Sequence, residues 1–187
     1  AYRDLTFDII KCVLLEDEFK DFNDAGIVVQ ANLKDSYEHL EDFLGWCRDN
    51  NKRPTIRLVK GAYWDHEVTV AQRNGWDIPV FINKQQTESS YEKCLDLLLS
   101  QHPVIKTAVA THNVRSIAKA CVLASHYQIE QSDIEFQMLN GMAEVLRQTI
   151  LDQNYWVRVE ESNHIEQRRH PRGHLDIRRI SSYRNQR

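Results

Sequence analysis

Two basic side chains lie in one apolar segment, Thr55–Asp65, whose sequence is Thr-Ile-Arg-Leu-Val-Lys-Gly-Ala-Tyr-Trp-Asp. The β-branched and aliphatic residues of its first half predict a strand. Side chains alternate across a strand, so Arg57 and Val59 share one face while Lys60 lies on the other. A charge on either face of an apolar strand is unfavourable unless it meets a partner or a ligand. The two basic residues therefore mark a candidate site.

The residues that follow this strand suit a flat ligand. Gly61 and Ala62 are small, so the backbone can approach a large planar group closely. Tyr63 and Trp64 add two aromatic faces beside them. Together with the basic residues of the strand, they predict a site for a planar, partly anionic cofactor.

The hydrophobic pattern predicts alternating strands and helices. Strands are predicted over residues 26–31, 55–60, 105–110, 134–137 and 156–159, with a short extended run at 78–82. Helices are predicted over 5–19, from 35 to about 49, over 65–73, and after the expected N-caps Thr87 and Asn113, with a last helix ending at 150. This alternation is typical of parallel βα units. The fold class is therefore α/β: an incomplete (β/α)8 TIM barrel that lacks about three strands, the N-terminal ones.

Polar residues stand at the ends of the predicted strands: Gln30, Lys60, Thr111, His112 and Gln137. In a (β/α)8 barrel, the carboxyl ends of the strands form the rim of the active site. No Gly-x-Gly-x-x-Gly follows a predicted strand, which argues against a glycine-rich dinucleotide-binding fold.

Composition narrows the class of protein. A chain of 187 residues can bury one substantial core, and a formal net charge of −3 predicts no nucleic-acid partner. No apolar run is long enough for a membrane span. Cys12, Cys47, Cys94 and Cys121 lie far apart in helical patterns, which predicts buried free thiols in a reducing compartment. The chain opens on Ala1 within a helical pattern, so we expect it to be part of a longer one.

The segment from Arg57 to Asp65 resembles the signature strand of the proline dehydrogenase domain, as in bacterial bifunctional proline utilization A proteins. The run Ala-Thr-His-Asn at 110–113 is identical to the corresponding family motif. The resemblance implies FAD as cofactor and oxidation of L-proline to Δ1-pyrroline-5-carboxylate, with hydride transfer to flavin N5. It also implies membrane quinone as electron acceptor and a fused or partner pyrroline-5-carboxylate dehydrogenase. The implied location is cytoplasmic, peripheral to the bacterial inner membrane.

The resemblance also assigns roles to individual residues. It places Arg57 at the reactive edge of the flavin, as the catalytic residue. Cofactor contacts are implied for Gln30, Arg57, Val59, Lys60, Gly61, Ala62, Tyr63, Trp64, Lys84, Thr87, Ala110, Thr111, His112, Asn113, Gln137 and Met138. Substrate contacts are implied for Ala62, Tyr63, Arg178 and Arg179, the last two as a clamp for the carboxylate of proline.

The sequence departs from the family pattern at several positions. Asn32 and Glu160 stand where tyrosines are usual, and Ser182 replaces the glutamate that follows the arginine pair. The apolar periodicity also stops at Val159. We therefore divide the chain into a partial proline dehydrogenase barrel over 1–159 and a divergent polar and basic tail over 160–187. Our hypothesis is that this tail is out of reading frame or replaced.

Two other functions remain open at this stage. A lysine at a strand end can form a Schiff base, so the chain could be a barrel lyase that uses Lys60. It could also be a non-enzymatic, truncated remnant of a proline dehydrogenase domain. His170 and His174 have helical spacing but no evident third ligand, so we expect no metal site.

Overall fold

In the computed structural model of the chain, the described residues are 3–19, 21–22, 24–160 and 181–183. The helices are α1 (Arg3–Leu15), η1 (Asp17–Phe19), α2 (Ser36–Asp49), α3 (Trp64–Asn74), α4 (Lys84–Ser100), α5 (Val114–His126), η2 (Gln131–Asp133) and α6 (Glu144–Asp152). The strands are β1 (Gly26–Gln30), β2 (Thr55–Val59), β3 (Lys106–Ala110), β4 (Ile134–Leu139), β5 (Trp156–Glu160) and β6 (Ser181–Tyr183). Arg178, Arg179, His170 and His174 lie outside the described residues.

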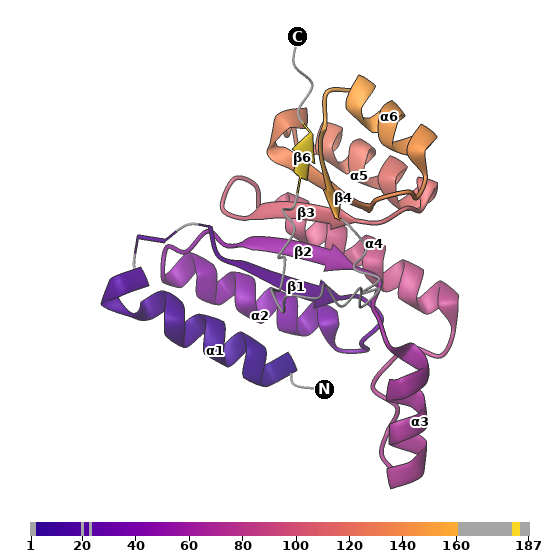
Figure 1. Cartoon of the computed structure of the whole chain (residues 1–187). Helices are drawn as coiled ribbons and strands as arrows, with labels where there is room; N and C mark the ends of the chain where they lie inside the picture. The colour runs from indigo at the N-terminus through magenta and orange to yellow at the C-terminus, as the bar shows by residue number, and fades with distance from the viewer. Residues whose placement is uncertain (1–2, 20, 23, 161–180, 184–187) are drawn as a thin grey trace, which may run out of the picture.

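The strands form one sheet in chain order (Figure 1). Strands β1 to β5 are parallel to one another, which confirms the predicted incomplete barrel. The short β6 was not expected; it pairs antiparallel with β5, with Val159 opposite Ser181. Helices follow most of the parallel strands, as the pattern of the sequence predicts.

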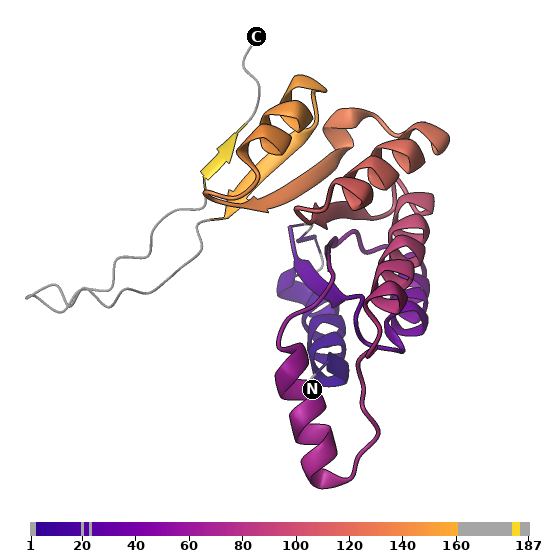
Figure 2. The ribbon, with the colours of Figure 1, turned by 90° about the vertical axis from the view of Figure 1, so that its right-hand side faces the viewer.

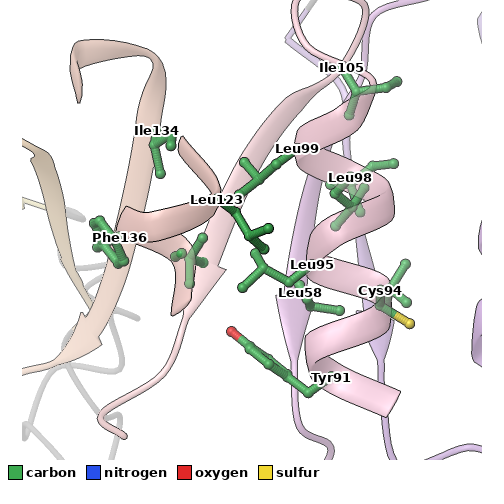
Figure 3. Packing of buried hydrophobic residues seen from close by; sticks show 14 of the residues in the cluster. Leu58, Tyr91, Cys94, Leu95, Leu98, Leu99, Ile105, Leu123, Ile134 and Phe136 are labelled. Atoms are coloured by element: carbon green, nitrogen blue, oxygen red, sulfur yellow. The ribbon is translucent and has the colours of Figure 1, made fainter. Parts of the chain in front are cut away.

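The main core lies between the sheet and α2, α4 and α5. On β2 the side chains of Ile56 and Leu58 are fully buried. Leu95 and Leu98 of α4 lie on the same side of the sheet as Leu58 (Figure 3). They belong to the helical spacing of apolar residues, so α4 forms because one of its faces can be buried there. Helices thus cover one face of the sheet, which we call the outer face; the opposite face is the inner face.

One local prediction was wrong. Thr87 does not cap a helix: α4 begins earlier, and Asn83 is its N-cap, accepting a hydrogen bond from the backbone N–H of Gln85 at 2.8 Å. Asn83 is the better cap because its short amide reaches the unpaired N–H groups of the first turn. The run 78–82, predicted to be extended, lies outside the sheet and makes an isolated bridge between Val80 and Leu33.

The prediction of four buried thiols was also wrong in part. Cys47 and Cys94 are buried, and burial raises the pKa of Cys47 to about 12 and that of Cys94 to about 11. Cys121 is only partly buried, and Cys12 is exposed. Helix α1 packs through Phe7, and a residue five positions further lies about 140° around a helix, which turns Cys12 to solvent.

Helix α3 projects away from the sheet in both views (Figures 1 and 2). Its bounds agree with the predicted helix at 65–73, and Gly75 ends it in the left-handed conformation. Ala71 is its only buried residue. The helix therefore lies next to the sheet only near its N-terminal end and extends away from it (Figure 2).

Candidate active site

The inner face of the sheet is hollowed into a groove of about 650 Å³. We call it the inner groove. Charged and amide side chains from β2, β4 and β5 line it: Arg57, Glu135, Gln137, Arg158 and Glu160. They point inward because they alternate with the buried residues of each strand.

Arg57 is held at two points inside this groove. Its Nε donates to Oε1 of Gln137 at 2.5 Å, and a terminal nitrogen donates to Oε2 of Glu160 at 2.9 Å. The side chains of Arg57 and Glu160 are 30% and 32% exposed. The guanidinium is therefore fixed in orientation and already paired with a carboxylate.

The network continues across the sheet. Gln137 donates through Nε2 to Oε1 of Glu135 at 2.5 Å, and Arg158 forms an ion pair with the same carboxylate at 3.0 Å. Together with Arg57 and Glu160, the groove holds two guanidinium groups against two carboxylates. Its charges therefore balance, which is less favourable for an anion than an isolated arginine would be.

Strand β3 makes this network geometrically possible. Ala108 lies between Arg57 of β2 and Glu135 of β4 in the strand register. Ala110 holds the next inward position, opposite Gln137. With only methyl groups at these two positions of β3, the long side chain of Arg57 can cross this strand and reach β4 and β5.

Sequence reasoning missed Glu135, Arg158 and Glu160 as parts of this network. Their signal was present: on β4 and β5, polar residues recur at every second position between buried apolar ones. Such alternation on strands that are otherwise buried indicates a polar interior face.

Lys60 lies on the other side of the sheet, as alternation predicts. Its Nζ contacts both carboxylate oxygens of Glu88, at 2.6 and 2.5 Å, and lies 5.7 Å from the ring centre of Tyr91. Both partners belong to α4. Lys60 therefore stands apart from Arg57, and its nitrogen is engaged by a carboxylate.

The turn after β2 is tied to the end of β1. Gln30 accepts a hydrogen bond through Oε1 from the backbone N–H of Ala62 at 2.9 Å. Gly61 has φ of 134°, and a Cβ there would lie 2.2 Å from side-chain atoms of Asn32. Only glycine fits this position without displacing Asn32, so the small residue expected from the sequence has a steric reason.

The two aromatic residues of the turn differ in exposure. Tyr63 precedes α3 in the left-handed conformation, with φ of 59°, and is 80% exposed. Trp64 is 40% exposed, and its indole N–H donates to the backbone oxygen of Phe81 at 2.9 Å. The structure thus leaves at least the ring of Tyr63 open to a ligand.

The residues of the Ala-Thr-His-Asn motif join β3 to α5 and β4. Asn113 caps α5 as predicted, accepting from the N–H of Ser116 at 3.1 Å, while Thr111 accepts from the N–H of Asn113 at 3.1 Å. His112 accepts through Nε2 from the N–H of Leu139 at 2.9 Å. This bond selects the tautomer with its proton on Nδ1. The motif therefore fixes the strand ends with respect to one another.

The remaining candidates lie in three places. Val59 and Ala110 are inward-facing and partly buried, near the strand ends. Lys84 and Thr87 lie in the first turn of α4. The side chain of Met138 is buried in the core on the outer face, so only its backbone can contribute to a site on the inner face.

A second hollow, of about 820 Å³, is larger than the inner groove. It lies between α2 and α4 and contains neither Arg57 nor any polar strand-end residue predicted from the sequence. We place the candidate site in the inner groove, because the fixed cation of Arg57 and the amide of Gln137 meet there.

Two further properties concern the described residues alone. No three histidine, cysteine, aspartate or glutamate side chains among them gather as metal ligands would. Within the same part of the chain, no helix has the length and apolarity needed to cross a membrane.

Comparison with known proteins places the chain in a family. Residues 1–160 match the family model described as proline dehydrogenase. The chain is 33% identical over 149 residues to the bifunctional protein PutA of Klebsiella aerogenes, which covers 79% of this chain and 11% of the relative. It is 30% identical over 157 residues to proline dehydrogenase 2 of Bacillus subtilis strain 168, covering 81% of this chain and 46% of that protein.

The fold agrees with solved structures of the same group. A crystal structure of proline utilization A from Bdellovibrio bacteriovorus, inactivated by N-propargylglycine, superposes with a TM-score of 0.83 at 38% identity. The match covers 86% of this chain and 17% of that one. The chain thus spans less than half the length of each of these relatives. A family model over 160 of its 187 residues is nevertheless decisive: the chain belongs to the proline dehydrogenase family.

Proposed function

We propose that this chain supplies the flavin-binding part of an FAD-dependent proline dehydrogenase, which oxidises L-proline to Δ1-pyrroline-5-carboxylate. The observation that carries the proposal is the position of Arg57. Its guanidinium lies in the inner groove, on the strand that precedes the turn of Gly61. A fixed cation at that position suits a cofactor ring that becomes anionic when it is reduced.

Polar side chains of the inner face support a site for a flavin ring. Gln137 lines the groove, where its amide oxygen accepts from Arg57 and its nitrogen donates to Glu135. Gln30 ends β1, with its oxygen accepting from the N–H of Ala62 and its amide nitrogen able to donate to a ligand. Gly61 lacks the side chain that would collide with Asn32, so the turn after β2 packs closely against that residue. The support for a flavin ring is therefore the amides, the fixed cation and the exposed ring of Tyr63.

The chain's own residues position the reactants. Bound FAD would accept at its N5 the hydride from the proline carbon next to the ring nitrogen, whose N–H proton is released as the C=N bond forms. Arg57 would stabilise the negative charge that this transfer creates. Ala62 and the exposed ring of Tyr63 are proposed to face the substrate, and Arg178 with Arg179 to hold its carboxylate. The residues of the Ala-Thr-His-Asn motif, with Lys84 and Thr87, are proposed to face the ribose and phosphates.

The setting is proposed by analogy with the family. We propose membrane quinone as the electron acceptor, a cytoplasmic location peripheral to the inner membrane, and a fused or partner pyrroline-5-carboxylate dehydrogenase that takes the product. No nucleic acid is expected as a partner.

The lyase alternative is disfavoured by the surroundings of Lys60. The ion pair with Glu88 requires the ammonium form, whereas a Schiff base needs the neutral amine. Failure of borohydride to trap substrate on Lys60 would agree with this.

The inactive-remnant alternative has one observation in its favour. Among the described residues, β1 has a strand on one side only, so the sheet does not close into a barrel. We therefore expect the isolated chain, given FAD, to bind less than stoichiometric flavin and to show no useful proline-dependent dye reduction.

The proposal is tested in a chimaera. Residues 1–160 replace the matching segment of Bacillus subtilis proline dehydrogenase 2, which supplies the rest of the barrel. We expect a yellow protein with a flavin spectrum, reduced anaerobically by proline. Arg57→Met should slow this reduction by about 10²-fold, whereas the exposed Arg115→Met should leave it unchanged. A folded chimaera that binds no FAD, or equal reduction rates in both variants, would contradict the proposal.

A further inference from the structure

We infer that Glu160 is a positioning residue that holds Arg57 and cancels its charge, so that the inner groove of this chain discriminates against anions at that point. The effect of Glu160 on a bound flavin rests on the proposed function. Its effect on Arg57 rests only on the contacts within the groove.

The first support is the geometry of the pair. Glu160 Oε2 accepts from a terminal nitrogen of Arg57 at 2.9 Å, and both side chains are about two-thirds buried. In such partly desolvated surroundings two opposite charges interact more strongly than on an open surface. An incoming anion would have to displace this carboxylate or share the guanidinium with it.

The second support is that Arg57 cannot easily turn away to another ligand. Gln137 holds its Nε from β4, and Glu135 in turn orients the amide of Gln137. Arg57 is thus held from two strands at once. Moving it would break its contacts with both β4 and β5.

The third support is the balance of charge. Glu135 is engaged by Arg158, so it does not offset Arg57. Glu160 is the carboxylate that does. A neutral side chain at this position would leave the cation of Arg57 uncompensated.

The test measures anion binding without any flavin, on the full 187-residue chain. Inorganic sulfate is titrated while the Nε–Hε signal of Arg57 is followed by NMR, with Arg57→Met to assign that signal. We expect Glu160→Gln to lower the dissociation constant for sulfate at this signal by about tenfold, because one negative charge at hydrogen-bond distance is removed. Glu160→Asp, which keeps the charge, should remain within about twofold of the wild type.

The matched control is Glu92→Gln. Glu92 is also paired with an arginine, Arg115, but on α4 and α5 at the outer face. It should leave the sulfate affinity at Arg57 unchanged. Equal affinities in wild type and Glu160→Gln would overturn the inference, as would an equal gain in Glu92→Gln. If Glu160→Gln does not fold, the affinity of Glu160→Tyr decides in the same way.

A second measurement links the inference to the proposed function. In the chimaera, Glu160→Gln should raise the midpoint potential of the bound flavin, because the reduced anion would face an uncompensated cation. A chimaera without flavin would contradict the proposed function alone, since the sulfate titration still decides the role of Glu160. If Glu160→Gln gains about tenfold in sulfate affinity but leaves the flavin potential unchanged, Arg57 binds anions without contacting the flavin.

Discussion

At the scale of single residues, the site depends on side chains that are absent as much as on those present. Gly61 is the clearest example, because its φ of 134° and the nearness of Asn32 both exclude a Cβ. Ala108 acts in the same way on β3, where its small side chain leaves room for Arg57 to cross. The polar network of the inner groove is thus possible because its neighbours are small.

The steric demand at Gly61 gives a testable expectation. Gly61→Ala should lower the free energy of unfolding by about 2 kcal/mol or more, since it combines unfavourable backbone geometry with a collision. Gly75→Ala is the matched control: Gly75 also has positive φ, 66°, but an added Cβ would meet nothing within 4 Å. We expect a loss of about 1 kcal/mol there. Urea unfolding measures both free energies. Equal losses in the two variants would mean that the side chain of Asn32 can move aside without strain.

The sequence predicted individual residues well where the reason was local. Arg57 and Lys60 lie on opposite faces because alternation within one strand decides it. The partners of Arg57 could not be predicted, since Gln137 and Glu160 lie 80 and 103 positions away and meet it only through the register of the sheet. The roles of Arg178 and Arg179 remain predictions, because they lie outside the described residues.

At the scale of elements, the start of α2 shows how a correct boundary can have another cause. Asp35 with Glu38 predicted the helix start, and α2 does begin at Ser36. The side chain of Asp35, however, makes no capping bond. It forms an ion pair with Arg3 of α1 instead. The boundary was predictable from local sequence, whereas the docking of α1 against it was not.

This ion pair makes the attachment of α1 dependent on pH. Burial alone would raise the pKa of Asp35, but the hydrogen bond and charge of Arg3 outweigh it and lower the pKa below the ordinary 3.8. The stabilisation is therefore present above about pH 3.8 and is lost as the pH falls through the lower folded value. Asp35→Asn should reduce stability at pH 7 by less than about 1 kcal/mol, because the pair is partly exposed.

Urea midpoints for wild type and Asp35→Asn, measured from pH 7 to pH 2.5, would show the difference narrowing below pH 3.8. Asp77→Asn, at an exposed position after α3, serves as control for the general loss of a carboxylate. A difference between wild type and Asp35→Asn that stays constant over this range would mean that the ion pair with Arg3 does not stabilise the fold.

At the scale of the whole molecule, β1 is an edge of the sheet that the described residues form. Val28 lies at the middle of this strand on the inner face and is 49% exposed. Nearby, α1 exposes Leu5, Ile9 and Val13, which recur every four residues along one face of the helix. An unpaired strand edge beside exposed apolar side chains favours association with other chains.

We therefore expect the isolated chain to self-associate through this edge. Val28→Lys should shift the population toward monomer, since an inward-pointing charge on an edge strand opposes pairing. Val122→Lys introduces the same charge on the exposed face of α5, where Val122 is 63% exposed, and should leave the association unchanged. Sedimentation velocity at several concentrations measures both. Similar behaviour of the two variants would place the contact elsewhere.

The opposite edge of the sheet has a different consequence. Residues 181–183 run antiparallel along β5 and occupy hydrogen-bonding groups of 157–159 (Figure 2). A ring of parallel strands can close only if its last strand offers those groups to a neighbour that runs in the same direction. Closure at β5 would thus be an exchange reaction, in which a new strand competes with β6 for one set of backbone partners. The rate of closure would depend on how often residues 181–183 detach from β5.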